Sequence, residues 1–143
     1  MSALGIKMEQ IRSELATRYP LRVVTRSLVD FADRPQADLL KGVYTVAAQS
    51  EDGYQNSLGR EAMFGRVSLV IIGQILVASP APPAPPAAPV ATEEAEFTMV
   101  EEIKTFVRTL PLGIDALTML RYRQSGQLEH PYGWIAIDLE MMQ

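Results

Sequence analysis

One short stretch, residues 79–93, restricts the possible folds more than any other part of the sequence. It reads Ser-Pro-Ala-Pro-Pro-Ala-Pro-Pro-Ala-Ala-Pro-Val-Ala-Thr-Glu and holds six of the ten prolines. Because proline fixes its φ angle and lacks an amide donor, this stretch is not expected to join a sheet or continue a helix. We predict an exposed connector in polyproline II conformation. Docking of its PxxP pattern on an aromatic groove is the alternative interpretation.

The composition indicates a single folded domain that spans residues 1–143. The chain is 48% hydrophobic and 21% charged, which is typical of a folded protein with a real core. The parts before and after the connector are too small to close separate cores. With 13 basic and 17 acidic residues the net charge is −4, which opposes broad electrostatic capture of nucleic acid.

Several classes of site are excluded by residue counts. The chain has no cysteine, so it has no disulfide, no thiolate nucleophile and no cysteine-based zinc site. Its single histidine, His130, cannot supply a multi-histidine metal centre. The longest apolar stretch, 67–78, is too short and too interrupted to cross a bilayer. The first residues lack the pattern of a secretory signal, so we expect the protein to stay in the cytoplasm of the cell that makes it.

Hydrophobic periodicity predicts the elements before the connector. Residues 4–15 carry apolar side chains at helical spacing, and this helix should end near Tyr19-Pro20. A strand, continuous or interrupted, is expected at 21–29, a turn or short helix at 32–40 and a second strand at 42–48. A long hairpin connection follows over 49–66. The strand predicted at 66–77 is apolar on both faces, which indicates a central strand covered on both sides.

The elements after the connector complete the predicted fold. Thr92 is expected to cap a helix with an acidic first turn, whose apolar face is Phe97, Val100, Ile103, Val107 and Leu110. Pro111 and Gly113 should stop it. Two strands, 117–124 and 133–142, form a hairpin. The order α-β-β-β-α-β-β predicts an α+β fold: a mixed, mainly antiparallel sheet of about four or five strands flanked by two main helices.

The sequence shows no catalytic constellation, and we expect a non-enzymatic protein without metal or cofactor. Asp138 and Glu140 point to one side of a strand; a cation site or a shared proton is less favoured there than a solvent face or an intersubunit salt bridge. His130 beside Glu129 leaves one enzymatic alternative, a small hydrolase or ligand-binding domain, but no nucleophile motif supports it. Five glutamates on or beside the helix after the connector are interpreted as a solvated face together with favourable charges at the helix start: Glu93, Glu94, Glu96, Glu101 and Glu102.

Two regions have the composition of a protein interface. The loop between the long strands mixes aromatic, methionine and charged side chains, which suits a surface that becomes ordered on assembly. Two arginines share one side of the strand 117–124 and could meet carboxylates of a neighbouring copy. The candidate interface residues are Tyr54, Arg60, Glu61, Met63, Phe64, Arg66, Arg121 and Arg123.

The chain as a whole resembles the tail terminators, also called minor tail or tail completion proteins, of long-tailed double-stranded DNA phages. The resemblance is carried by the opening amphipathic helix, the long hairpin 42–77 and the helix 94–110 that ends at Pro111. Its most specific part is the closing Ser-Gly turn and the Trp-led alternating strand over 125–141. It covers nearly the full chain, and the Pro/Ala segment departs from the shorter connection usual in the family.

The resemblance implies a structural virion protein that is assembled in the host cytoplasm and placed at the head-proximal end of the tail. Such proteins form a ring, expected here to be a homohexamer, that caps the tail tube and stops its polymerisation. The implied partners are further copies of the chain, the tail tube protein and the head-completion or connector protein. Genomic DNA passes through the lumen without sequence-specific binding, and no membrane is involved. A head-closure or neck protein of the same virion is the alternative.

Overall fold

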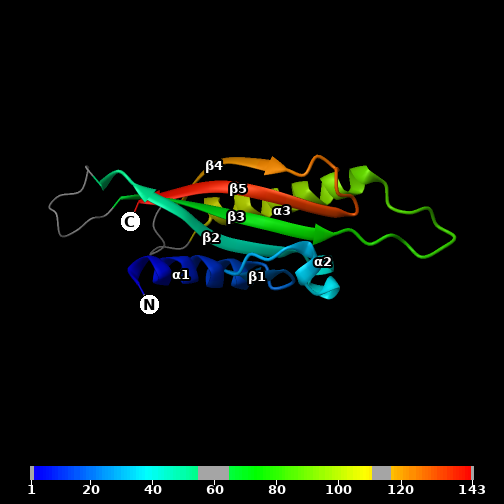
Figure 1. Cartoon of the computed structure of the whole chain (residues 1–143), viewed down its shortest axis with the longest axis horizontal. Helices are drawn as coiled ribbons and strands as arrows, with labels where there is room; N and C mark the ends of the chain where they lie inside the picture. The colour runs from blue at the N-terminus through cyan, green and yellow to red at the C-terminus, as the bar shows by residue number, and fades with distance from the viewer. Residues whose placement is uncertain (1, 55–64, 111–116, 143) are drawn as a thin grey trace.

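A mixed five-stranded sheet organises the molecule (Figure 1). The computed structural model describes residues 2–54, 65–110 and 117–142. Its strands lie in the order β1-β2-β3-β5-β4; β1 pairs with β2 in parallel, and the other neighbours are antiparallel. The expected α+β class is confirmed. In chain order the elements are α1 (Ala3–Arg18), β1 (Val23–Thr25), the 3-10 helix η1 (Phe31–Asp33), α2 (Gln36–Lys41), β2 (Val43–Asp52), β3 (Arg66–Leu76), α3 (Pro89–Arg108), β4 (Leu117–Gln124) and β5 (Tyr132–Met142).

Strand β3 occupies the centre of the sheet, as its apolar sequence predicts. It pairs with β2 on one side and with β5 along its whole length on the other. Leu69 and Ile71 are fully buried on its helix-covered face, and Val70 and Leu76 are buried on the opposite face. A strand with two buried faces needs apolar side chains in both alternating sets, and β3 has them.

Helices α1 and α3 pack on the same face of the sheet and form one core with it. The Ser2 side chain caps α1 by accepting a hydrogen bond from the Gly5 amide at 3.0 Å. The helix ends at Arg18 because Pro20 follows its last turn. Its buried residues are Met8, Ile11 and Leu15, which confirms the helical face expected from the sequence.

Helix α3 begins earlier in the chain than the sequence analysis predicts. The helix begins at Pro89, with Ala88 as N-cap, so Thr92 lies within its second turn and does not cap it. Proline suits the first turn of a helix because the amide it lacks would have no intrahelical acceptor. The connector predicted at 79–93 therefore ends earlier than expected, because residues 89–93 belong to α3. Its remaining part projects from one end of the molecule (Figure 1), and the Ala87 amide donates to Ser79 Oγ at 3.2 Å across its base.

The second face of the sheet is covered by the segment that precedes β2. Leu39 of α2 packs against Val43 and Leu76, and the Phe31 ring lies 5.3 Å from the Tyr132 ring. The predicted strand at 21–29 is reduced to three residues, since the chain leaves the sheet after β1 to reach this face. Strand β2 continues to Asp52, beyond the expected end, and the β4–β5 hairpin is confirmed. None of the helices in the described part is long and apolar enough to cross a lipid bilayer.

Candidate functional site

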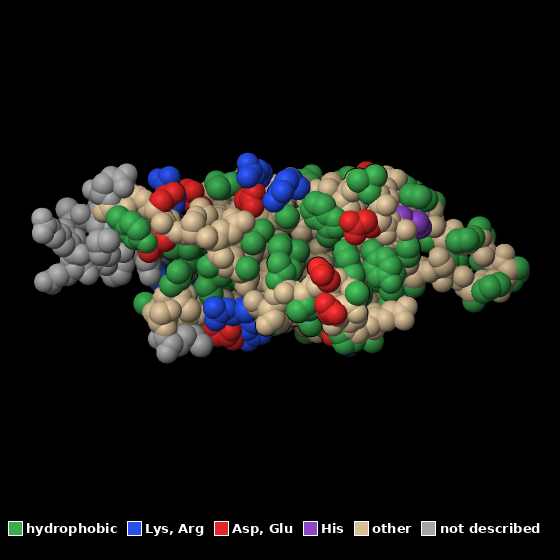
Figure 2. Space-filling view, in the orientation of Figure 1, with side chains coloured by type: hydrophobic (Ala, Val, Ile, Leu, Met, Phe, Trp, Pro, Cys, Tyr) green, Lys and Arg blue, Asp and Glu red, His purple; other side chains and the backbone are tan. Residues whose placement is uncertain are grey.

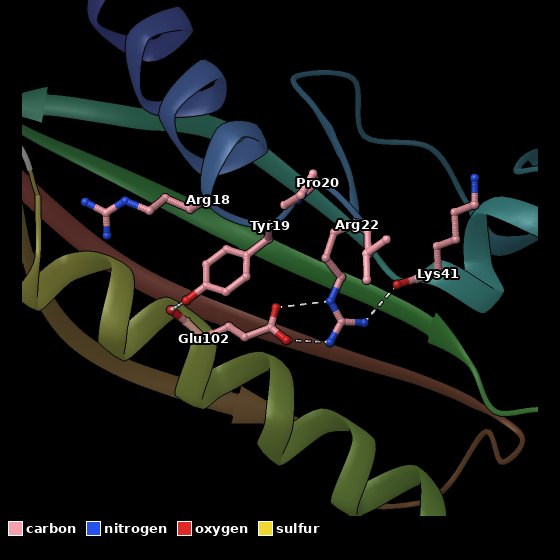
Figure 3. A pocket seen from close by; sticks show the side chains of 7 residues that line it. Arg18, Tyr19, Pro20, Arg22, Lys41 and Glu102 are labelled. Carbon is pink, nitrogen blue, oxygen red and sulfur yellow. Dashed lines mark hydrogen bonds and ion pairs between the residues drawn. The ribbon is translucent and has the colours of Figure 1, made fainter.

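A pocket of about 650 Å³ opens where the end of α1 meets α3 and the end of α2 (Figure 3). Pro20 turns the chain after α1 and exposes Leu21, so that the next residue, Arg22, points back toward α3. The lining is partly apolar and carries three cationic groups against one carboxylate. The lining residues are Arg18, Tyr19, Pro20, Leu21, Arg22, Lys41 and Glu102.

Arg22 is the centre of this pocket and has all three of its nitrogens engaged. Its Nε donates to Glu102 Oε1 at 3.1 Å, and its Nη2 donates to Glu102 Oε2 at 2.8 Å. Its Nη1 donates to the Lys41 carbonyl at 2.8 Å. Burial alone would lower the pKa of Arg22, but the hydrogen bonds and the charge of Glu102 outweigh burial and raise it. Arg22 therefore remains charged, and its hydrogen bonds tie the residue before β1 to α3 and to the end of α2.

Two tyrosines extend this network into the core. The Tyr19 hydroxyl donates to the Glu102 carbonyl at 2.8 Å. The fully buried Tyr44 hydroxyl lies 2.8 Å from Glu102 Oε1 and 3.0 Å from the Met99 carbonyl. Burial raises the pKa of Tyr44 far above its ordinary value, and the Glu102 charge raises it further. Both hydroxyls therefore stay protonated and act as hydrogen-bond donors.

The polar groups of the pocket bind one another and hold the chain segments together. Glu102 accepts from Arg22 and Tyr44, so it is not placed as a free general base. The expectation that Glu102 belongs to a solvated face is wrong, because only 20% of its side chain is exposed. Sequence reasoning missed this site. Its partners are 80 residues apart, and no local pattern links them.

Glu96 is a second carboxylate that the sequence assigned wrongly to a solvated face. It is fully buried and accepts hydrogen bonds from the Ser125 hydroxyl and, at 2.9 Å, from the Trp134 amide. Gln124 Nε2 donates to it at 3.3 Å. These neutral donors satisfy the buried carboxyl group and attach α3 to the β4–β5 hairpin. Gly133 lets the strand approach, since a Cβ there would lie 2.7 Å from Glu96 Oε2.

His130 joins three segments and has both ring nitrogens occupied. Its Nε2 donates to the Ala87 carbonyl at 2.9 Å, because a carbonyl can only accept. Its Nδ1 lies 2.6 Å from Thr92 Oγ1. The Glu129 side chain is exposed. This geometry holds the connector and α3 to the hairpin loop, and it gives no support to the acid-base alternative.

Asp138 and Glu140 have partners within the same chain. Arg121 Nε donates to Asp138 Oδ2 at 2.6 Å across the β4–β5 pair. Arg66 Nε lies 3.6 Å from Glu140 Oε1 across the β3–β5 pair. The two carboxylates of β5 therefore pair with arginines on different neighbouring strands, Asp138 with β4 and Glu140 with β3. Where the structure describes the chain, no three histidine or acidic side chains converge as a metal site would require.

Of the other predicted interface residues, the structure describes Tyr54, after the end of β2, and Arg123, on β4. Tyr54 is 39% exposed, and its hydroxyl donates to Glu51 Oε1 at 2.8 Å. Arg123 lies on the exposed outer strand β4, on the same face as Arg121, as expected. Within residues 2–54, 65–110 and 117–142, Arg123 has no ion-pair partner. The remaining four candidates lie outside the described residues: Arg60, Glu61, Met63 and Phe64.

No family model matches the sequence, and no curated protein matches it either. Strand β4 lies at one border of the sheet and pairs with β5 alone among the described strands. This edge strand is eight residues long, with Leu120 54% exposed and Tyr122 38% exposed. An exposed edge of this kind is a template for pairing with another chain.

Proposed function

We propose that the protein is a structural subunit of a phage tail. It forms a ring on the head-proximal end of the tail tube, stops tube polymerisation and provides the surface for joining the head. In this role it binds further copies of itself, the tail tube protein and the head-completion or connector protein. Genomic DNA passes through the ring without sequence-specific contacts, and the protein resides in the virion.

The observation that carries this proposal is the outer edge of β4, which has no strand partner among the described residues. Folded proteins blunt a long edge with charges and bulges, and β4 has both, yet exposed Leu120 and Tyr122 leave apolar area on the strand. Such an edge suits a protein that completes its sheet by assembly. The carboxylates and the histidine that chemistry would need are instead engaged in ties within the described part of the fold. These contacts favour an assembly role over catalysis.

Ring closure gives termination a physical basis. A contact between two different patches on each subunit produces a closed ring when the rotation per subunit divides a full turn. A ring bound to the tube through one side then blocks further addition if its other side does not bind tube protein. This mechanism needs shape and not turnover, in agreement with the ties described above.

The test is electron microscopy of particles made by a phage from which this coding sequence has been deleted. Over-long, headless tails are expected, because nothing then stops the tube. Tails of normal length that remain unattached to heads would instead assign the protein to the neck, the alternative from the same virion. Infectious virions with normal tails would overturn both assignments. A complementing copy supplied from a plasmid should restore tail length and infectivity.

A further inference from the structure

The sheet has a second free edge on the side opposite β4. Strand β1 pairs only with residues 43–45 of β2, whereas β2 continues to Asp52. Residues 46–52 therefore present an outer edge with no strand partner among the described residues. The two free edges, β4 and the 46–52 edge, lie on opposite borders of the sheet (Figure 1).

The two edges carry opposite charge. Strand β4 contains Arg121 and Arg123 and no acidic residue. The 46–52 edge ends in Glu51 and Asp52 and contains no basic residue. Basic side chains along the β4 border are visible at the top of Figure 2. Opposite charges across paired strands are favourable, and like charges directly opposite one another are unfavourable.

The charges needed for pairing are available. Arg123 and Asp52 are both exposed, and neither forms an ion pair within the described ranges. Arg121 is bound to Asp138 through Nε, and its side chain remains 73% exposed. Its other guanidinium donors can therefore reach a second carboxylate.

We propose that β4 of one copy pairs antiparallel with the 46–52 edge of the next copy, so that neighbouring sheets become continuous. This inference names the subunit contact of the ring and rests on the proposed function for its closure. The pairing is head-to-tail, because each copy contributes β4 on one border and β2 on the other. Contacts of this kind form closed rings when the rotation per subunit divides a full turn and open filaments otherwise, and they do not form isolated two-fold dimers.

Strand direction supports this pairing. The three antiparallel steps from β2 through β3 and β5 to β4 make β4 antiparallel to β2 within one sheet. Rotation about a ring axis to which the strands are inclined, as in a barrel, preserves the sense in which each strand runs along that axis, and this inclination accommodates a stagger between neighbouring copies. The β2 strand of the next copy therefore meets β4 in antiparallel orientation. The alternative of pairing two β4 strands would bring arginines together, and the charge pattern opposes it.

The bulges in β4 and β2 determine which residues of the two strands share a face of the sheet, and this restricts the register in which the strands can pair. Strand β4 has a bulge between Met119 and Arg121, and β2 has one between Ala48 and Ser50. Beyond these bulges, Arg121 and Arg123 share one face of the sheet with Ser50 and Asp52. An antiparallel ladder that places Arg121 opposite Asp52 also places Arg123 opposite Ser50. Asp52 then lies directly opposite Arg121 and diagonally opposite Arg123.

Disulfide trapping tests this register without background, because the chain has no cysteine. The double variant Arg123→Cys with Ser50→Cys is oxidised and examined on a non-reducing gel. Within one copy these positions are separated by three strand spacings across the sheet, about 14 Å, and are displaced along the strands as well, which is too far for a disulfide. A ladder of covalent oligomers up to a closed ring is expected. Monomers only would overturn the proposal, as would equally abundant dimers from Arg123→Cys alone.

Charge reversal tests the same contact by its energetics. Arg123→Glu and Asp52→Arg should each raise the apparent dissociation constant of assembly about tenfold. The double variant should recover part of the loss, because Arg123→Glu supplies a diagonal carboxylate for Asp52→Arg while Arg121 stays directly opposite it. Arg108→Glu, at an exposed position near the end of α3, is the matched control and should leave assembly unchanged. Ring formation is followed by sedimentation and by electron microscopy on purified tail tubes.

The two proposals can fail separately. If the unmodified protein caps tubes but neither the cysteine pair nor the charge reversals affect its rings, the edge contact is wrong and the terminator role stands. If the cysteine pair yields a closed covalent ring but deletion of the protein leaves normal infectious virions, the contact stands and the terminator role is wrong.

Discussion

The guanidinium of Arg22 and the carboxylate of Glu102 meet in a two-pronged ion pair, with nitrogen-oxygen distances of 3.1 and 2.8 Å. The pair joins the residue before β1 to the middle of α3. Only 15% and 20% of the two side chains are exposed, so water screens the contact weakly. It fixes the position of the α1–β1 connection over the helix layer.

Removing one partner of this pair should destabilise the fold. Arg22→Ala leaves the Glu102 carboxylate half-buried with only Tyr44 as its side-chain donor, and we expect a loss of about 2–3 kcal/mol in the free energy of unfolding. Urea denaturation measures it. Lys104→Ala, which breaks the more exposed pair with Glu101, should cost less than about 0.5 kcal/mol. Equal losses in the two variants would contradict a special role for Arg22.

Stability at high pH should depend on Tyr44. Its pKa is raised in the folded protein, so its contribution is fully present below the ordinary tyrosine value of about 10 and is lost as the pH rises above it. The slope attributable to this group is about 1.4 kcal/mol per pH unit. Tyr44→Phe should lower stability near neutral pH and flatten the decline between pH 10 and 11. Parallel curves for the two proteins would show that Tyr44 does not titrate on unfolding.

The sequence predicts the elements whose stability is local. The spacing of Met8, Ile11 and Leu15 is sufficient to indicate α1, and the two apolar faces of β3 indicate its central place. The β4–β5 hairpin also follows from alternation and turn residues. In each case the hydrophobic pattern lies within one segment, and the face that this pattern defines is the face that packs in the core.

The ties between distant segments could not be predicted in this way. Phe97 and Val107 were expected on the buried face of α3, but Glu96, Met99 and Phe106 are buried more completely. Burial of Glu96 is possible because Ser125 and Trp134 supply donors from a hairpin about 30 residues away. Helical periodicity counts a glutamate as polar and cannot detect such partners.

The buried Glu96 should be essential for attachment of the β4–β5 hairpin. Glu96→Ala would leave the Ser125 hydroxyl and the Trp134 amide without an acceptor, and we expect a loss of about 3 kcal/mol in the free energy of unfolding. Glu96→Gln keeps one acceptor oxygen and should cost about half as much. Urea denaturation of both variants checks this order. Glu94→Ala is an exposed control on the same helix. A loss in Glu96→Ala no greater than in this control would refute the role.

His130 should hold the proline-rich connector against the hairpin loop. His130→Ala removes the hydrogen bonds to Ala87 and Thr92, so the connector should open more often. Cleavage by elastase after Ala87, the alanine of residues 81–88 that is not followed by proline, should become about tenfold faster, since proteolysis follows the population of the open form. Glu129→Ala, at an exposed neighbouring position, should leave the cleavage rate unchanged. Equal rates in both variants would contradict the tie. Loss of a turnover activity in His130→Ala, with connector cleavage unchanged, would instead revive the hydrolase alternative.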